Sequence, residues 1–174
     1  ETFETADQFL SRLPFEGPCC IVLDIRMPGL SGLELQENFV VQQIKIPVII
    51  ITGHGDVPMA VRAMKAGAVD FIEKPFNDEL LLESIRTALN LDVEQRASQA
   101  ERAEIAARLA HLTPREHEVM EMVTNGRANK EIALTLGVSA KTVEAHRARV
   151  MEKMQAASLA ELVKMAIAAR IASH

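Results

Sequence analysis

The sequence predicts an α/β domain with a doubly wound parallel sheet, then a connecting helix and a smaller all-α domain. Three short apolar runs, each ending at a polar residue and separated from the next by a helical pattern, predict the first domain. From residue 112 onward the chain shows only helical patterns separated by glycine-containing turns, which predicts the second. With 174 residues, the chain has room for two small domains.

The first strand lies within residues 19–32, whose sequence is CCIVLDIRMPGLSG. Its apolar residues run into Asp24, and a Met-Pro-Gly loop then leads to Ser31, which starts a capping box for the next helix. An Asp after a strand is often a helix cap, but Asp24 lies too far ahead of this helix to cap it. Because ligands bind at the carboxyl ends of strands in open parallel sheets, Asp24 is a candidate site residue.

Two further strands bring polar groups to the same edge of the predicted sheet. Residues 47–51 are apolar and end at Thr52, and residues 69–72 end just before Lys74. A carboxylate, a hydroxyl and an ammonium at one edge can accept, hold and neutralise a phosphoryl group. In this interpretation Asp24 is the nucleophile, Thr52 a hydrogen-bond partner and Lys74 the counter-charge.

Helical patterns separate and follow these strands. Amphipathic spacing and capping residues predict three helices in the first domain, at residues 6–13, 33–44 and 57–66. Asn77 caps a fourth, longer pattern that continues towards Leu109. Its part from residue 92 to 110 is rich in Ala, Glu, Arg and Gln, which favours a helical connector, with a coiled-coil dimer seam as an open alternative.

Three motifs of the first domain resemble the receiver domain of bacterial two-component response regulators, which has a flavodoxin-like fold. They are Asp24 with residues 27–29 (Met-Pro-Gly), Thr52 after its strand, and Lys74-Pro75 after the next. Residues 51–76 are closely similar to the FixJ branch. The resemblance implies that Asp24 takes phosphate from the phosphohistidine of a sensor histidine kinase.

The same resemblance implies further roles around the site. Mg²⁺ would be held by the Asp24 carboxylate and the backbone carbonyl of Arg26, together with an acidic pair from the family's first strand. The peptide bond between Lys74 and Pro75 would be cis. Phe71 falls at the family's switch aromatic, which turns inward when Thr52 engages the phosphoryl group; an ordinary core residue is the alternative.

The family's first strand and its acidic pair are not in the sequence, which begins at Glu1 and leads at once into a helical pattern. In the strand order 2-1-3-4-5 that strand lies between the second and third. We therefore expect residue 1 to lie about 30 residues inside a longer natural chain. We also expect a gap in the sheet and a weakened metal site, with a domain-swapped remnant as the alternative.

Composition and charge exclude several classes. No apolar run approaches the roughly 18 residues of a membrane span, so no membrane partner is expected. The adjacent Cys19 and Cys20 are interpreted as small buried hydrophobes rather than a redox or metal pair, which fits a reducing cytoplasm. The first 91 residues carry a net charge of −6 and the last 63 a net charge of +2, so only the second part suits a polyanion.

Four helices are expected in the second domain, at residues 114–125, 129–136, 140–154 and from 159 onward. The second and third are joined by a tight turn at Gly137, as in a helix-turn-helix, whose second helix enters the major groove of DNA. Residues 129–154 strongly resemble the LuxR/FixJ-type DNA-binding domain. The predicted organisation is therefore a receiver (1–91), a helical linker (92–111) and a DNA-binding domain (112–174).

Two sets of residues are candidates for contacts with DNA. Glu144, Ala145 and Ala148 match positions from which the family reads base edges, although Glu144 stands where many members carry Lys. Phosphate contacts are expected from Lys130, Lys141, Thr142, Arg147 and Arg149. Each basic residue taken alone could instead belong to a solvated helix face, and His146 is either a packing residue or a contact.

The leading interpretation is a non-enzymatic, phosphorylation-controlled transcription factor that binds promoter operators as a homodimer. Phosphorylation of Asp24 is expected to reorganise the face between residues 56 and 90 and to promote dimerisation there. The apolar stripe of the last helix is a second candidate dimer contact, and RNA polymerase is a further expected partner; this stripe is formed by Leu162, Val163, Ala166 and Ile167. The resemblance to the FixJ branch suggests nitrogen-fixation or oxygen-responsive genes. Two other classes stay open: an aspartyl-phosphate phosphatase, although Arg26 stands where such enzymes place a carboxylate, and a protein-interaction module without a DNA role.

Overall fold

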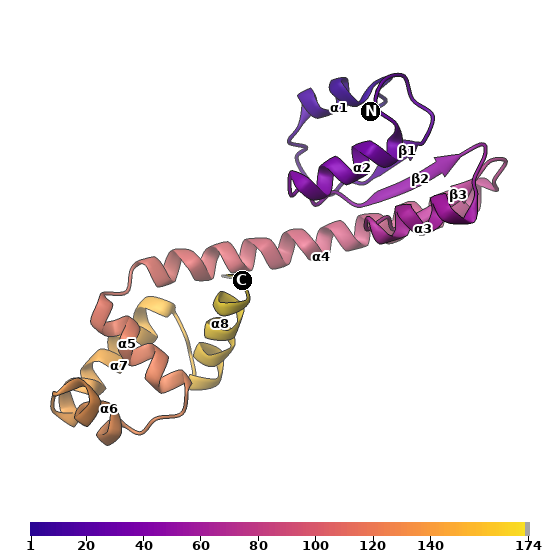
Figure 1. Cartoon of the computed structure of the whole chain (residues 1–174). Coiled ribbons are helices and arrows are strands. Elements are labelled where there is room, and N and C mark those ends of the chain that lie inside the picture. The colour runs from indigo at the N-terminus through magenta and orange to yellow at the C-terminus, as the bar shows by residue number, and fades with distance from the viewer. Residues whose placement is uncertain (173–174) are drawn as a thin grey trace. The chain divides into compact units, whose positions relative to one another are not determined.

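The computed structural model describes residues 1–172 and divides the chain into two compact units. We call residues 1–97 the N-terminal unit and residues 98–174 the C-terminal unit (Figure 1). Each unit has its own hydrophobic core. Across residues 1–172, no helix combines the length and the apolar character needed to cross a bilayer.

The N-terminal unit contains a three-stranded parallel sheet in the order β1-β2-β3. The strands are β1 (Ile21–Asp24), β2 (Val48–Thr52) and β3 (Asp70–Glu73). The register pairs Leu23 with Ile50 and Ile50 with Phe71. The parallel sheet predicted from the three apolar runs is therefore confirmed, and all three strands end at the same edge.

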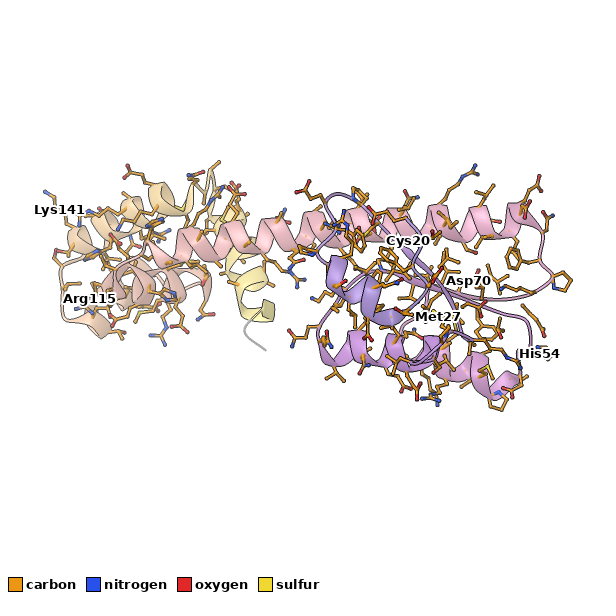
Figure 2. The ribbon with its side chains drawn as sticks, turned by 90° about the horizontal axis from the view of Figure 1, so that it is seen from above. Cys20, Met27, His54, Asp70, Arg115 and Lys141 are labelled. Atoms are coloured by element: carbon orange, nitrogen blue, oxygen red, sulfur yellow. The ribbon has the colours of Figure 1, made fainter. Side chains whose placement is uncertain are left out.

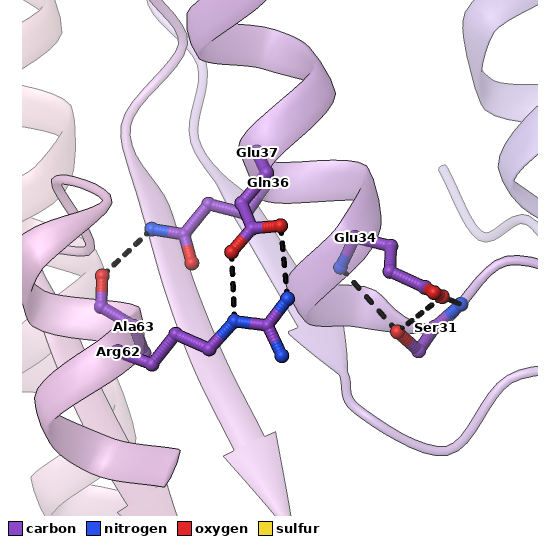
Figure 3. Close-up of polar contacts among 6 residues, drawn as sticks. All are labelled: Ser31, Glu34, Gln36, Glu37, Arg62 and Ala63. Carbon is purple, nitrogen blue, oxygen red and sulfur yellow. Dashed lines mark hydrogen bonds and ion pairs between the residues drawn. The ribbon is translucent and has the colours of Figure 1, made fainter. Parts of the chain in front are cut away.

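Helices connect these strands in the order the sequence predicts. They are α1 (Ala6–Arg12), α2 (Gly32–Val41), α3 (Val57–Lys65) and α4 (Asp78–Ala110). Ser31 forms the predicted capping box with Glu34 at the start of α2 (Figure 3), and the Asp56 carboxylate accepts from the Met59 backbone N–H at 2.7 Å at the start of α3. The predicted connector is part of α4, which is one continuous helix of 33 residues.

The sheet is covered on both faces, which makes the domain doubly wound. Ile50 packs with α1, α2 and α3, in a cluster that includes Phe9, Phe39 and Ala63. Ile49, its neighbour in the strand, packs on the other face with Ala88 of α4. Ile49 and Ile50 are both fully buried because adjacent strand residues point to opposite faces of a central strand.

Two expectations about the first strand need correction. The sheet has no internal gap: its three strands are contiguous, and β1 forms an edge to which no other strand in residues 1–172 pairs. Cys19 and Cys20 precede β1 rather than lying in it, and both are half-buried instead of buried. Because β1 is an edge strand, no neighbouring strand covers the segment that leads into it.

The C-terminal unit contains four helices after the end of α4. They are α5 (Pro114–Thr124), α6 (Asn129–Leu136), α7 (Ala140–Met154) and α8 (Leu159–Ala172). Thr113 forms the predicted capping box with Glu116. Gly137 ends α6 in the left-handed conformation, at φ 65°, which a residue with a side chain adopts only at a cost. The helix-turn-helix topology of α6 and α7 is thus present as predicted.

Two apolar stripes expected at dimer contacts are used inside the C-terminal unit. Leu162 and Ala166 of α8 are 1% and 9% exposed and belong to the core formed with α5 and α7. Ile105, a member of the possible coiled-coil seam, is 5% exposed and lies in the same core. The part of the α8 stripe left to solvent is formed by Ile167, together with half-buried Val163.

Candidate functional site

The structure brings Asp24 and Lys74 into direct contact at the carboxyl edge of the sheet. The Lys74 Nζ donates to Asp24 Oδ2 at 2.7 Å, across 50 residues of sequence. The Lys74-Pro75 peptide bond is cis, as the resemblance implied. The second carboxylate oxygen, Oδ1, accepts from the Arg26 backbone N–H at 3.0 Å. The Asp24 side chain remains one-third exposed, so its carboxylate is accessible from solvent.

These contacts fix the charge state of the Asp24 carboxyl. Partial burial alone would raise its pKa, but the hydrogen bonds from Lys74 and the Arg26 backbone outweigh this effect. With the charges of Lys74 and Arg26 added, the pKa of Asp24 lies below its ordinary value. Asp24 is therefore ionised at neutral pH, which a carboxylate nucleophile requires.

Thr52 ends the neighbouring strand, and its backbone carbonyl accepts from the Lys74 N–H at 2.7 Å. Its hydroxyl is turned towards its own loop: it lies 3.3 Å from the His54 carbonyl and accepts from the His54 N–H at 3.3 Å. The side chain is almost fully buried. Thr52 is thus on the predicted edge, and its hydroxyl is engaged with the backbone of His54.

Phe71 lies in β3 beside the loop that follows Thr52. A Cβ atom placed on Gly55 would lie 3.0 Å from the Phe71 ring, so the loop backbone and the aromatic ring are in close contact. The Gly55 N–H also donates to the Glu73 carboxylate at 3.2 Å. Movement of the 53–55 loop therefore changes the packing of Phe71. Glu73 holds this loop through its bond to the Gly55 N–H, a role that the sequence did not indicate.

Gly32 is a second residue whose role the sequence analysis missed. A Cβ at this position would lie 2.4 Å from the backbone oxygen of Asp24, a separation that real Cβ atoms essentially never show. The Gly32 N–H also donates to the Ile25 carbonyl at 3.1 Å. The first turn of α2 consequently packs directly on the backbone that holds Asp24, and the glycine after Ser31 was the available signal.

The described residues offer too few ligands for a metal ion at this edge. The expected ligands are the Asp24 carboxylate and the Arg26 carbonyl, whereas Mg²⁺ prefers six oxygen ligands. In residues 1–172 no three His, Cys, Asp or Glu side chains are grouped so that they could hold a metal. The charge of Asp24 is compensated by the ammonium group of Lys74 and not by a metal-binding cluster of the described residues. These residues alone do not fit a complete magnesium site.

The candidate DNA-binding residues on α7 form an exposed face. The exposed residues of this face lie on one side of the helix between residues 141 and 149, while Val143 and Val150 point into the core on the other side. Lys141 projects away from the ribbon near the start of the helix (Figure 2). The candidate residues that are exposed on α6 and α7 are Lys130, Lys141, Thr142, Glu144, Ala145, Ala148 and Arg149.

Arg147 differs from the other candidates because it is half-buried. Its Nη1 donates to the Asn129 Oδ1 at 2.6 Å, which joins α7 to the first turn of α6. His146 is also half-buried, and its buried Nδ1 has no hydrogen-bond partner among the described residues. The geometry thus gives Arg147 a role in holding the two helices of the motif together, and it favours the packing interpretation of His146.

An ion pair with a buried carboxylate fixes α7 to the start of α5. The Lys153 Nζ donates to Glu116 Oε2 at 2.6 Å and to the His111 carbonyl at 3.1 Å. The bonds from Lys153 and from the Thr113 backbone N–H outweigh the effect of burial and lower the pKa of Glu116 to about 2. Lys153 is therefore engaged within the protein and adds nothing to the exposed face of α7.

Comparison with known proteins yields matches over both units. Residues 1–86 match the response regulator receiver domain, and residues 110–166 match the luxR family of bacterial regulatory proteins. The chain is 52% identical over 153 residues to the transcriptional regulatory protein FixJ of Azorhizobium caulinodans, covering 88% of this chain and 72% of that protein. Its identity to FixJ of Bradyrhizobium diazoefficiens is 50% over 167 residues, covering 96% of this chain and 82% of that protein. A solved structure of the response regulator StyR has a TM-score of 0.83 at 43% identity, covering 95% of this chain and 84% of StyR.

These matches confirm both resemblances that the sequence motifs indicated. The matched families combine in transcriptional response regulators and not in enzymes, which excludes the phosphatase alternative. A match to a DNA-binding domain over residues 110–166 likewise disfavours an interaction module without a DNA role.

Proposed function

Because the chain belongs to the FixJ-like two-component response regulators, transcription factors with a receiver and a LuxR-type DNA-binding domain, we propose that Asp24 is its phosphorylation site and α7 its DNA-reading helix. The observation that carries the first assignment is the Asp24–Lys74 contact at 2.7 Å, at the edge where three parallel strands end. Phosphorylation by a sensor histidine kinase is the input that a receiver domain receives.

In this proposal an oxygen of the ionised Asp24 carboxylate attacks the phosphorus of the kinase phosphohistidine. A bond from carboxylate oxygen to phosphorus forms, the phosphorus–nitrogen bond breaks, and the histidine nitrogen leaves with its electron pair and takes a proton from solvent. Lys74 already lies at the carboxylate and compensates the negative charge of the acyl phosphate.

Thr52 is the proposed link from the phosphoryl group to the rest of the N-terminal unit. Its hydroxyl gives up two bonds of 3.3 Å to His54 and donates instead to a phosphoryl oxygen. The 53–55 loop then loses its contact with Thr52, and the Phe71 ring that touches Gly55 gains room to move inward. A change at Asp24 would thereby reach the outer surface of β3.

Receiver domains generally use Mg²⁺ at an acidic pocket around the phosphorylation site. For this chain we propose that the Asp24 carboxylate and the Arg26 carbonyl would contact the ion. These two ligands leave most of its coordination to waters, phosphoryl oxygens and other groups, so the 174-residue chain is expected to bind Mg²⁺ weakly.

For the C-terminal unit we propose operator binding through the exposed face of α7. Glu144, Ala145 and Ala148 would face base edges, since Glu accepts from cytosine and Ala contacts the thymine methyl group. Phosphate contacts would come from Lys130, Lys141, Thr142 and Arg149, with Arg147 acting chiefly through its bond to Asn129.

Dimerisation on phosphorylation is proposed because one copy of the C-terminal unit carries little positive charge. Leu159, Val163 and Ile167 lie four residues apart on α8 and remain at least partly exposed, which offers a contact between two copies. The FixJ relatives suggest that the regulated genes serve nitrogen fixation or oxygen response. We propose RNA polymerase as the downstream partner and the cytoplasm as the location.

The phosphorylation half of the proposal is tested with acetyl phosphate. Wild-type chain and Asp24→Asn are treated in parallel, and dimer formation is followed by gel filtration and operator binding by fluorescence anisotropy. We expect both responses in the wild type and neither in Asp24→Asn. An Asp24→Asn variant that responds as the wild type does would reject Asp24 as the site.

The DNA half is tested with two Lys→Ala variants of equal charge change. Lys141→Ala, on the α7 face, should weaken operator binding and reduce the slope of log K against log salt by about 1. Lys164→Ala on α8, also an exposed lysine, should leave both quantities unchanged. Equal losses from the two variants would contradict the assignment of α7 as the DNA-contacting helix.

A further inference from the structure

A pocket of about 180 Å³ opens at the amino-terminal edge of the sheet, opposite the edge that carries Asp24. It lies wholly within the N-terminal unit, between α2, the strand β2 and the part of α4 near residue 91. Its apolar wall is formed by Phe39, Ile44, Val48, Val69 and Leu91. A cavity of about 150 Å³ with such walls is large enough for a molecule of benzene size.

Gln36 gives this pocket an unusual polar group. The side chain lies in the pocket wall and is only 2% exposed. Its Nε2 donates to the Ala63 carbonyl at 3.0 Å (Figure 3), which fixes the orientation of the amide. Its Oε1 is buried and has no hydrogen-bond partner within the described part of the chain. The amide cannot turn to satisfy this oxygen without losing the bond to Ala63.

The neighbouring polar side chains of α2 do not supply the missing donor. Glu37 is engaged with Arg62 through two bonds of 2.7 and 2.9 Å on the outer surface (Figure 3). The other polar residues at the pocket, Lys45 and Gln95, are exposed. A buried acceptor without a donor, in the wall of a pocket that has both apolar and polar sides, calls for a donor brought from outside.

We propose that this pocket binds a small molecule with a compact apolar body and one hydroxyl or amino group, whose hydrogen is donated to Gln36 Oε1. The apolar body would lie against Phe39 and Val48, which are 3% and 4% exposed. A monocyclic phenol has this size and carries a single donor. The site is separate from the phosphorylation edge and from the DNA-contacting face of α7.

The test uses phenol and toluene as probes of the same shape, one with the donor and one without. The full 174-residue chain is labelled with ¹⁵N and ¹³C, and each probe is titrated while the Gln36 side-chain amide and the Val48, Val69 and Leu91 methyl signals are followed by NMR. We expect saturable shifts at these signals and an affinity for phenol about tenfold above that for toluene.

Gln36→Leu removes the acceptor and should abolish the preference for phenol while toluene still binds. Leu91→Trp fills the mouth of the pocket from a residue that is 37% exposed and should abolish binding of both probes without affecting the fold. Glu37→Gln, next to Gln36 but outside the pocket, serves as the matched control and should keep the preference. Equal affinities for phenol and toluene in the wild type, or unchanged shifts in both pocket variants, would overturn the proposal and leave water as the partner of Gln36.

Discussion

Replacing Lys153 by Met should destabilise the C-terminal unit and change its response to acid. Lys153 holds the carboxylate of Glu116, which is 2% exposed, and so joins α7 to the start of α5. The pKa of Glu116 falls from 4.5 to about 2 in the folded protein. That difference corresponds to about 3 kcal/mol of stability.

Two features reduce the share of this energy that the substitution removes. The Lys153 side chain is 34% exposed, so solvent screens its charge, and the Thr113 backbone N–H still bonds Glu116 after the change. We therefore expect Lys153→Met to cost about 2 kcal/mol at neutral pH.

The direction of the pH effect follows from the lowered pKa of Glu116. A carboxyl group with a depressed folded-state pKa contributes stability above its unfolded value, and this contribution is lost as the pH falls. The wild type should therefore lose stability between pH 4.5 and about 2, and Lys153→Met should lose less across the same interval.

Amide hydrogen exchange at Val143 and Val150, which are buried on α7, measures this stability within the C-terminal unit. Lys141→Met is the matched control, because it removes an exposed lysine from the same helix and should change stability by less than about 0.5 kcal/mol. If Lys153→Met loses as much stability as the wild type between pH 4.5 and about 2, or if the two variants have equal effects, Lys153 does not stabilise the unit through Glu116.

Three further outcomes are expected. Gly32→Ala should slow phosphorylation of the chain by acetyl phosphate roughly tenfold to a hundredfold, because the added Cβ would meet the Asp24 backbone oxygen at 2.4 Å. Gly53→Ala is the control and should have no such effect, because a Cβ at residue 53 meets nothing within 4 Å. Glu144→Lys should tighten non-specific DNA binding and steepen its salt dependence by about 1 in slope, measured by fluorescence anisotropy; an unchanged slope would place residue 144 away from DNA. Mg²⁺ titration of the 174-residue chain by calorimetry should give a dissociation constant above about 1 mM, because the ligands expected within residues 1–172 are the Asp24 carboxylate and the Arg26 carbonyl; tight stoichiometric binding would contradict this.

Local signals allowed much of the fold to be predicted from the sequence. The caps at Ser31, Asp56 and Thr113 were correct because each depends on a side chain and a backbone N–H only three residues apart. The contact between Asp24 and Lys74 could also be predicted, since parallel strands that end in polar residues present them at one edge.

Features that depend on distant packing could not be predicted. Asp92 lies at the start of the predicted connector, yet it is 2% exposed and accepts from the Cys19 backbone N–H at 2.8 Å and from Arg96 at 2.7 Å. The pattern of α4 alone does not reveal that the segment before β1 covers this residue. The inward position of Arg147 likewise depends on Asn129 in the preceding helix, which helical periodicity cannot indicate.

Locating the phosphate on the chain shows whether Asp24 receives the phosphoryl group. The protein is incubated with acetyl phosphate, its intact mass is measured, and the acyl phosphate is trapped and mapped to a peptide. We expect one added phosphoryl group, in the peptide that contains Asp24, and none in Asp24→Asn. Phosphate mapped to another residue of the wild type would show that Asp24 is not the site.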